Sequence, residues 1–412
     1  MRLLWLLMIS IHLFAIDATL QIEKDVEDRT HIAIVDASST PTPKVSQIMM
    51  SDLKISGHFL VDTDIYKEGF SSSIVTPKLK SQEYVIKYKY DSSSGAKLVI
   101  RVLKASNSKE IFKKSYAISN IEKMPFLVHK AVYDINGFLR YPDISWINRY
   151  VIFSRYTTPR HSEIVVADYT FNYKKVVIRG GLNLFPKWSS REQKSFFYTS
   201  FNGLYPTLYK LNIYTGAKSK IVSSEGMLVC SDVSKGGSKI LATMAPNGQP
   251  DIYQIDISTK QKTRITKFNG IDVNGKYINN ESSIVFVSNR LGYANIFKKP
   301  IKGGAISQIV YHGKNNNSVD TYKNKVVYSS RESNNAFGDN NFNIYLTDIN
   351  GDRVRALTTT GINQFPRFSN DGTIVQYIKR QNGSSFIGYS NLQTHQSVLF
   401  PLGVKKIQAI DW

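Results

Sequence analysis

The segment Ile252-Tyr253-Gln254-Ile255-Asp256, near the middle of this 412-residue chain, has a counterpart about every 44 residues. Each counterpart is a short, mostly apolar run with an aromatic residue or an Asp nearby. The first residues of the six copies are spaced by 44, 44, 44, 48 and 43 positions: Ile164, Leu208, Ile252, Ile296, Ile344 and Ile387. A second apolar segment precedes each copy, and its last residues are spaced by 45, 44, 44, 42 and 49 positions: Phe153, Tyr198, Ala242, Phe286, Tyr328 and Tyr377. Two markers that share one period indicate six copies of one structural unit.

A repeat of about 40–50 residues with several short strands is typical of a β-propeller blade. Residue pairs suited to tight hairpins fall where such turns are needed: Thr215-Gly216, Gly236-Gly237, Gly303-Gly304, Asn350-Gly351 and Asp371-Gly372. We therefore predict a six-bladed β-propeller over residues 141–412. The 48-residue spacing is explained by a polar loop at 332–341 in the fifth blade. An array of β-sandwiches is the alternative architecture.

The end of the chain predicts how the ring closes. A propeller must close, because an open ring leaves unpaired strand edges. The segment Ile407-Gln408-Ala409-Ile410-Asp411-Trp412 is similar to the start of a blade rather than its end. We expect it to add a strand to the first blade, with Trp412 as a structural anchor.

Residues 19–140 follow a different pattern and predict a small α/β domain. Strands are expected at 30–35, 84–90 and 98–104, the last two joined by a Ser- and Gly-rich turn. Helices are expected at 43–55, with Gly57 as its stop signal, and at 121–139. The second helix has candidates for one apolar face: Phe126, Val128, Val132, Ile135 and Leu139. Residues 19–29 have little to pack and predict an extended acidic arm.

The first eighteen residues have the pattern of a secretory signal peptide. Arg2 precedes an apolar run from Leu3 to Phe14, and the small residues Ala15 and Ala18 follow. The run is too short to span a bilayer. We expect cleavage after Ala15 or Ala18 and export without a lipid anchor, since no Cys follows the run. A buried first helix is the alternative.

Composition narrows the class of protein. With 42% hydrophobic and 21% charged residues, the chain has the material for a large core and is not of the disordered class. No apolar run reaches the roughly 18–20 residues of a membrane span. The single cysteine, Cys230, excludes an internal disulfide framework and a cysteine-built zinc site. We expect Cys230 to be a buried residue of a strand.

The net charge of +21 comes mainly from residues 141–412, which hold 34 Lys and Arg against 17 Asp and Glu. No run of five or six basic residues occurs. Two interpretations stay open. The cations are scattered over edges and loops for solubility, or they form a basic face toward an acidic partner or an anionic envelope polymer. We expect no nucleic-acid partner.

Motifs of known chemistry are missing from the sequence. There is no H-E-x-x-H, no G-x-S-x-G elbow, no P-loop and no dinucleotide fingerprint. We interpret His129 as a packed or rim residue rather than a catalytic base. Asp168, Asp256 and Asp348 recur in phase with the repeat, which predicts structural hydrogen bonds to turns. We predict no catalytic residue, no metal site and no cofactor.

Several segments carry a family resemblance: Ser51-Asp52-Leu53 with Ser56-Gly57 and Phe59, the stretch 129–137, the stretch 162–169, and the two blade starts 185–189 and 365–372. Together with the order of leader, α/β domain and propeller, they resemble the TolB family of the periplasmic Tol–Pal system. The resemblance covers essentially the whole mature chain.

The resemblance implies a monomeric, non-catalytic scaffold. It would bind the lipoprotein Pal at one mouth of the propeller channel and the C-terminal domain of TolA through the N-terminal arm. It would thereby support outer-membrane integrity and envelope constriction at cell division.

The resemblance also implies the residues of both surfaces. The Pal surface would lie on loops that enter the innermost strands: Asn183, Leu184, Phe185, Glu225, Gly226, Met227, Asn269, Asp272, Val273, Ser318, Val319, Asp320, Asn363, Gln364 and Phe365. The arm that binds TolA would be Thr19, Leu20, Gln21, Ile22, Glu23, Lys24, Asp25, Val26, Glu27 and Asp28. Phe185, Met227 and Phe365 would be apolar anchors on the first surface, or would pack between blades.

Two other functions stay open at this point. A propeller enzyme could act on an envelope glycan or peptide through carboxylates that line the channel. A basic patch could bind an anionic polymer, and that binding would weaken steeply with salt.

Overall fold

The computed structural model describes residues 29–334, 340–402 and 407–412. The predicted signal peptide (1–18) and the predicted TolA-binding arm (19–28) lie outside the described residues. No helix in the described ranges is long and apolar enough to cross a membrane.

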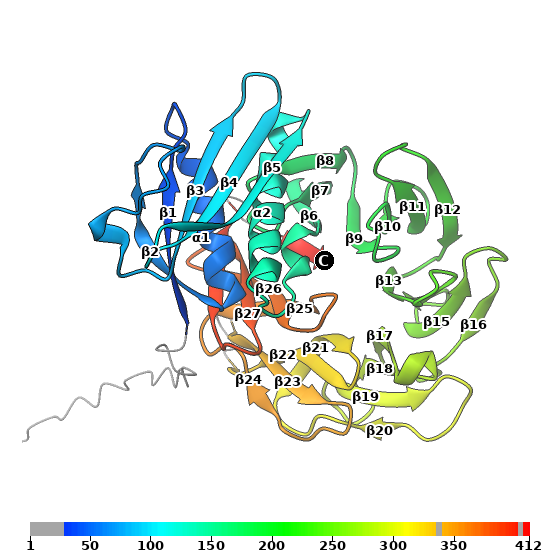
Figure 1. The fold of residues 1–412 in the computed structure, drawn as a ribbon. Coiled ribbons are helices and arrows are strands. Elements are labelled where there is room, and N and C mark those ends of the chain that lie inside the picture. Colours follow the sequence, from blue (N-terminus) through cyan, green and yellow to red (C-terminus); the bar gives the residue numbers. More distant parts are fainter. Residues whose placement is uncertain (1–28, 335–339, 403–406) are drawn as a thin grey trace, which may run out of the picture.

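The N-terminal part is a five-stranded sheet with two helices on one face (Figure 1). The strand order is β2-β1-β3-β4-β5, with β1 parallel to β2 and β3 and the remaining pairs antiparallel. Its elements are β1 (Thr30–Asp36), α1 (Pro43–Ser56), β2 (Phe59–Tyr66), η2 (Pro77–Leu79), β3 (Tyr84–Asp91), β4 (Ala96–Lys104), β5 (Lys109–Ile118), η3 (Ile121–Lys123) and α2 (Met124–Phe138).

Helix α1 forms where the periodicity predicts it. Pro43 occupies the first turn, where its missing N–H costs nothing, and Val45, Ile48, Met49 and Leu53 are fully buried. Gly57 ends the helix in the left-handed conformation, with φ of 79°, and its N–H donates to the carbonyl of Lys54. A Cβ at position 57 would lie 2.3 Å from the side chain of Thr394 in the propeller, so this glycine also permits close domain contact.

The second predicted helix is confirmed with a different start. Residues 121–123 form a 3₁₀ turn, and α2 begins at Met124. Val128, Val132 and Ile135 are fully buried against the sheet. Phe126 and Leu139 are only half-buried, because Phe126 faces the propeller and Leu139 lies beyond the last helical turn.

The described residues between 151 and 411 form six four-stranded antiparallel blades, and one parallel bridge between Phe342 and Ile362 joins the fifth blade to the sixth (Figure 1). The strands of each blade are given from the innermost outward. Blade one contains β29 (Ile407–Asp411), β6 (Val151–Thr158), β7 (His161–Ala167) and β8 (Lys174–Ile178), and blade two contains β9 (Asn183–Trp188), β10 (Ser195–Ser200), β11 (Thr207–Asn212) and β12 (Lys218–Ser223). Blade three contains β13 (Leu228–Val233), β14 (Lys239–Met244), β15 (Asp251–Asp256) and β16 (Lys262–Arg264). Blades four to six are β17 (Asp272–Ile278), β18 (Ser283–Ser288), β19 (Asn295–Pro300), β20 (Ser307–Gln308); β21 (Lys314–Tyr322), β22 (Lys325–Arg331), β23 (Phe342–Asp348), β24 (Arg355–Ala356); and β25 (Ile362–Phe368), β26 (Ile374–Gln381), β27 (Ser384–Asn391), β28 (Ser397–Pro401).

The two repeat markers in the sequence are the second and third strands of each blade. These strands occupy the middle of every sheet, are buried on both faces and therefore have the strongest apolar signal. The innermost strands each contain a register shift, and most residues of the outermost strands are exposed or half-buried, so neither stands out in the sequence.

The predicted closure is confirmed. Strand β29 pairs antiparallel with β6, so the last residues of the chain form the innermost strand of the first blade. Trp412 is largely buried, and its ring lies 5.6 Å from that of Trp146 and 5.3 Å from that of Tyr389. Trp146 belongs to η4 (Ser145–Asn148), the turn that leads from the N-terminal domain into the propeller. The anchor thus joins both ends of the propeller.

The N-terminal domain sits beside blades one and six (Figure 1). Helix α1 contacts the turn after β7 through Lys44, whose Nζ donates to the carbonyl of Asn172. The carbonyls of Ile55 and Ser56 accept hydrogen bonds from Asn391 at the end of β27. Both turns lie on the side where the innermost strands end. We call that end of the channel the domain-side mouth and the opposite end the open mouth.

Truncating the anchor tests how much closure contributes to stability. Trp412→Ala removes a largely buried ring that packs where the two ends of the propeller meet, and we expect it to lower the free energy of unfolding by about 3–5 kcal/mol. Urea unfolding followed by fluorescence and circular dichroism measures the change. Leu204→Ala, at a side chain that is 88% exposed, is the matched control and should change it by less than about 0.5 kcal/mol. Equal midpoints for both variants would contradict an anchoring role.

Candidate functional site: the propeller channel and its mouths

A ring of six alternating charges lies across the middle of the channel. Each innermost strand contributes one ionisable side chain, in the order Lys187, Asp232, Lys276, Asp320, Arg367 and Asp411. Their spacing of 45, 44, 44, 47 and 44 residues is the period of the blades. Sequence reasoning missed five of the six. The signal was available, since extending the repeat to its polar positions reveals the alternation.

The ring ties the blades together in pairs. Asp411 accepts from the backbone N–H of Trp188 at 2.8 Å and pairs with Lys187 Nζ at 2.7 Å. Asp320 likewise accepts from the N–H of Phe368 at 2.9 Å, and Asp232 from the N–H of Tyr277 at 2.8 Å. Each aspartate therefore bonds to the residue directly after a basic ring member in the next blade.

Burial and neighbouring charges act against each other in the ring. Burial raises the pKa of Asp320, but Lys276 and Arg367 outweigh it and hold that pKa at about 2. Burial dominates at Asp232 and raises the pKa of that carboxyl. The pKa of Lys276 is lowered by burial despite its 2.8 Å contact with Asp320. The oppositely charged groups of the ring therefore interact with one another, as expected of a structural network of ion pairs.

An apolar cavity of about 220 Å³ lies between the charged ring and the open mouth. The side chains that form its wall come from several innermost strands or their entries: Phe185, Met227, Val273, Ser318 and Phe365. Lys187 and Arg367 of the ring form part of its floor. Met227 is 46% exposed and stands at the rim.

The backbone bends to present these side chains. Phe185 and Phe365 adopt left-handed conformations with φ of 55° and 56°, which bulky residues rarely adopt. Asn274 and Ser318 do the same at the related positions of blades four and five. All four line the cavity and lie within or beside a register shift of their strand. Strain of this kind is stored mainly at functional sites.

Further apolar side chains are exposed on the loops around the open mouth. They lie on the turns between the second and third strands and on the segments that enter the first strands: Leu204, Tyr205, Ile271, Leu291, Tyr293 and Tyr311. Leu204 and Tyr311 are the most exposed of them. Aromatic and aliphatic side chains grouped in this way are typical of protein-binding surfaces.

The predicted Pal-binding residues only partly occupy this surface. The expectation that they lie on loops is wrong for eleven of the fifteen, which belong to β9, β17, β21 and β25. Only Glu225, Gly226, Met227 and Asn269 precede a strand. The strands begin earlier than the sequence suggests, because the residues before each register shift still pair with the second strand.

Six of the predicted side chains are buried, and this corrects their assignment to an exposed surface: Asn183, Leu184, Asp272, Val319, Asp320 and Asn363. Several of their polar groups have internal partners, although the side-chain oxygen of Asn363 has none. Both carboxylate oxygens of Asp272 accept from Arg290 at 2.9 Å, and Asn363 donates to the carbonyl of Thr360 at 2.8 Å. Phe185 and Phe365 are half-buried and face the cavity, so they combine packing with a mouth position.

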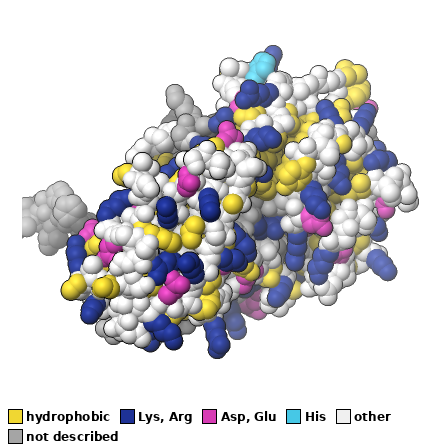
Figure 2. Space-filling view, turned by 45° about the horizontal axis from the view of Figure 1, so that its top comes forward, with side chains coloured by type: hydrophobic (Ala, Val, Ile, Leu, Met, Phe, Trp, Pro, Cys, Tyr) yellow, Lys and Arg dark blue, Asp and Glu magenta, His cyan; other side chains and the backbone are white. Residues whose placement is uncertain are grey.

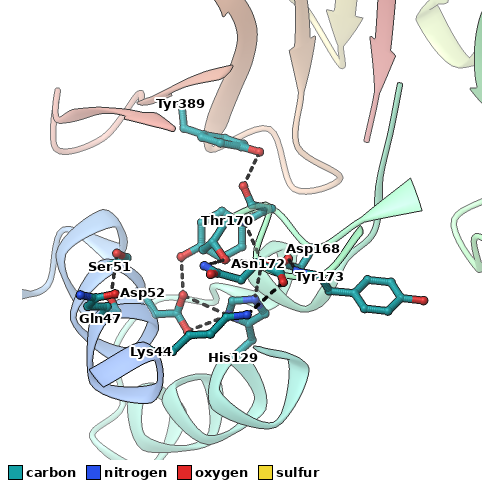
Figure 3. Close-up of polar contacts among 11 residues, drawn as sticks. Lys44, Gln47, Ser51, Asp52, His129, Asp168, Thr170, Asn172, Tyr173 and Tyr389 are labelled. Atoms are coloured by element: carbon teal, nitrogen blue, oxygen red, sulfur yellow. Dashed lines mark hydrogen bonds and ion pairs between the residues drawn. The ribbon is translucent and has the colours of Figure 1, made fainter. Parts of the chain in front are cut away.

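A second polar cluster joins the N-terminal domain to the propeller (Figure 3). The imidazole of His129 on α2 lies 2.8 Å from Asp52 on α1 through Nδ1 and 3.2 Å from Asp168 through Nε2. Tyr169 donates a short hydrogen bond to Asp52, and its carbonyl accepts from Tyr389 of blade six at 2.9 Å. His129, Asp52 and Asp168 are completely buried.

The charge of this cluster is set by its two carboxylates. Burial lowers the pKa of His129, but Asp52 and Asp168 outweigh it and raise that pKa to about 9. Burial opposes ionisation of Asp168, yet hydrogen bonds from His129 and Thr170 lower the pKa of its carboxyl. Burial raises the pKa of the Asp52 carboxyl, so the lowered pKa of Asp168 is the firmer support for a cationic His129 between the two domains. The interpretation of His129 as a packed residue is confirmed.

The in-phase aspartates cap turns, as predicted. Asp256 accepts from the N–H groups of Ser258 and Thr259, both at 2.9 Å, and Asp348 accepts from that of Asn350 at 2.8 Å. Asp168 caps its own turn through the N–H of Thr170 at 2.8 Å. Only Asp168, of these three, also reaches the N-terminal domain. The turn at Asp168 in blade one, which has counterparts in other blades, therefore also contacts the N-terminal domain.

The described residues offer neither a reactive thiol nor a cluster of metal ligands. Cys230 is buried in β13, as predicted, and burial raises the pKa of its thiol to about 12. No group of three or more His, Cys, Asp or Glu side chains in the described ranges could hold a metal ion.

The fold and channel define a class: a six-bladed propeller with a small α/β domain docked at one mouth. Residues 148–406 match the family model described as the TolB beta propeller domain. The chain is 41% identical to the Tol-Pal system protein TolB of Wolinella succinogenes over 99% of both chains. It is 39% identical to that of Helicobacter hepaticus over 99% of this chain and 98% of the relative. The crystal structure of TolB from Acinetobacter baumannii shares the fold, with a TM-score of 0.75 at 21% identity, covering 93% of this chain and 96% of the other. The chain belongs to the TolB family.

The His129 cluster predicts a stability that depends on pH. The pKa of His129 is about 9 in the folded protein, against about 6.5 for an exposed imidazole. Its contribution, on the order of 3 kcal/mol, is complete below about pH 6.5 and is lost as pH rises through 9. Thermal unfolding between pH 6 and pH 10 measures the decline.

His129→Gln is the control for this prediction. The amide keeps part of the hydrogen bonding but does not titrate, so the decline attributable to the cluster should disappear in the variant. An identical pH profile in both proteins would contradict the assignment. Hydrogen exchange in α1 and α2 at pH 7 and pH 10 provides a second readout, with faster exchange expected only in the unmodified protein at the higher pH.

Proposed function

We propose that this TolB-family protein is a non-catalytic periplasmic scaffold of the Tol–Pal envelope system. Its open mouth binds the soluble domain of Pal, and its N-terminal arm, residues 19–28, binds the C-terminal domain of TolA. Through these contacts it supports outer-membrane integrity and envelope constriction at cell division. Family membership over nearly the full chain supports the Tol–Pal assignment.

One observation carries the assignment of Pal to the open mouth. The apolar cavity at this end is lined by left-handed Phe185 and Phe365, and exposed apolar side chains such as Met227 and Tyr311 surround it. An apolar anchor of a partner fits a pocket of this kind, and the surrounding loops supply a rim. The domain-side mouth is partly flanked by the N-terminal domain, so the open mouth is the freer face (Figure 1).

The ring chemistry favours a scaffold over the alternative of a propeller enzyme. Asp320 and Asp411 form ion pairs with basic neighbours, and Asp232 accepts a backbone hydrogen bond. A general acid or base needs a carboxyl poised near neutral pH and within reach of substrate. Asp320 and Asp411 are ion-paired instead. Burial raises the pKa of Asp232, but its carboxylate is engaged by the backbone N–H of Tyr277 and connects blade three to blade four.

Changing the rim tests the Pal surface. Met227→Asp places a charge on an apolar rim, and we expect it to weaken binding of the same organism's soluble Pal domain at least tenfold, or about 1.4 kcal/mol. Calorimetric titration at two salt concentrations measures the affinity. Tyr214→Asp is the matched control, because Tyr214 is 62% exposed on a turn at the other end of the blade. Equal loss in both variants, or no loss in either, would overturn the mouth assignment.

Removing the arm tests the second contact. Deletion of residues 19–28 should abolish binding of the TolA C-terminal domain, because an extended segment supplies the main-chain hydrogen bonds of strand addition. The melting temperature should change by less than about 1 °C, since residues 19–28 are rich in acidic side chains and have little apolar surface to bury. Calorimetry and thermal unfolding of the same preparation give both readouts. A melting temperature several degrees lower would show that the segment is part of the fold.

A further inference from the structure

The domain-side mouth contains a second cavity, separate from the open mouth and on the other side of the charged ring. Its volume is about 530 Å³, within the range of about 300–1,000 Å³ typical of small-molecule sites. Residues that follow the innermost strands form its walls, among them Ser189, Ser190, Ser234 and Asn370. Aromatic rings of Tyr322 and Phe368 lie among these polar groups.

The ring members that line this cavity are Lys187 and the three aspartates Asp232, Asp320 and Asp411, whereas Lys276 and Arg367 do not line it. Lys187, Lys276 and Arg367 match Asp232, Asp320 and Asp411 in number. Two of the aspartates are ion-paired, and each accepts a backbone N–H from the next blade. The whole ring is therefore neutral in formal charge, although three of its four members on this side are carboxylates.

Three further cations line the cavity above the ring: Arg149, Arg191 and Lys235. In the part of the chain that the structure describes, none of the three forms an ion pair with a carboxylate. Lys235 Nζ donates to the side-chain oxygen of Asn280 at 3.0 Å. The nearby carboxylate of Glu281 accepts the backbone N–H of Lys235.

Arg149 is the most constrained of these cations. One of its terminal nitrogens donates to the carbonyl of Arg191 at 2.9 Å, which draws the two arginines together. Its Nε is buried without a hydrogen-bond partner in the described structure. Burial lowers the pKa of Arg149, and Asp411 of the ring opposes that effect. A partly buried guanidinium without a paired carboxylate is costly, and a bound anion would remove that cost.

We propose that the domain-side cavity binds a small ligand through an oxyanion, a carboxylate or a phosphate, held by Arg149, Arg191 and Lys235. Guanidinium groups suit this ligand because their planar forks match carboxylate and phosphate oxygens. The hydroxyl groups of Ser190 and Ser234 line the same cavity and are suited to its remaining polar atoms. The site lies at the opposite end of the channel from the proposed Pal surface and does not depend on it.

Calorimetric titration of the purified protein tests the proposal with three probes. They are inorganic phosphate, the dipeptide N-acetyl-Glu-Glu and the neutral N-acetyl-Gln-Gln amide. We expect binding of one molecule per chain by phosphate, by the acidic dipeptide, or by both, and no binding of the neutral dipeptide. The probe that binds identifies the phosphate or the carboxylate source. Absence of binding by both anions, or equal binding of the neutral dipeptide, would overturn the proposal.

A pair of double variants separates a built site from general attraction to a basic protein. Arg191→Glu with Lys235→Glu reverses two cavity cations, and we expect at least tenfold weaker binding of the anionic probe. Lys175→Glu with Lys262→Glu makes the same change in net charge on the exposed outer strands β8 and β16, and should change affinity less than twofold. Equal weakening by both double variants would show attraction to net charge only and overturn the site.

Titration with Pal completes the design. The Arg191→Glu, Lys235→Glu variant should bind Pal as the unmodified protein does, which also shows that it is folded. Loss of Pal binding together with a normal circular dichroism spectrum would mean that the two mouths are not separate sites, and would overturn the proposal as stated.

Discussion

The pairing of β29 with β6 is the constraint on which the rest of the structure depends. Six blades bury their strand edges only if the ring closes, and here the last five-residue strand of the chain closes it. Asp411 at the end of that strand then bonds to blade two, and equivalent aspartates tie blade three to blade four and blade five to blade six. The strand that closes the propeller therefore also supplies Asp411 to the charged ring. The ring fills the centre of the channel and divides it into an apolar open mouth and a polar domain-side mouth.

The buried cluster at His129 makes the two faces of the propeller different. Two helices of the N-terminal domain and one turn of the propeller share a single proton-bearing imidazole (Figure 3). The imidazole keeps its charge only while it contacts both carboxylates, one on α1 and one in blade one. These contacts hold the two domains in one relative position. One face of the propeller is thereby partly covered and the other left open.

On the face drawn in Figure 2, Lys and Arg side chains are dispersed among neutral ones rather than collected in one patch, as expected of cations placed for solubility.

The sequence predicted the architecture well because propeller blades repeat. The second and third strands of each blade are buried on both faces, so their apolar runs recur at one period and can be counted. Helix α1 could be placed from Pro43, its apolar spacing and Gly57, and closure from the similarity of residues 407–412 to a blade start. The candidate site was harder to predict. Asn183, Asp272 and Asn363 were expected on loops but are paired, buried strand residues, since register shifts in the innermost strands do not show in the composition.

The sequence by itself determined the repeat, the number of blades, the order of the two domains and the family, because these depend on patterns that are local or periodic along the chain. Tertiary structure decided the sites. Asp52, His129 and Asp168 come from two helices and one turn that the sequence separates by 77 and 39 residues, and no local pattern links them. Arg149, Arg191 and Lys235 likewise meet only because neighbouring blades converge on the channel axis. Whether a cation is matched or unmatched depends on which carboxylates fold against it, and only the closed ring settles that.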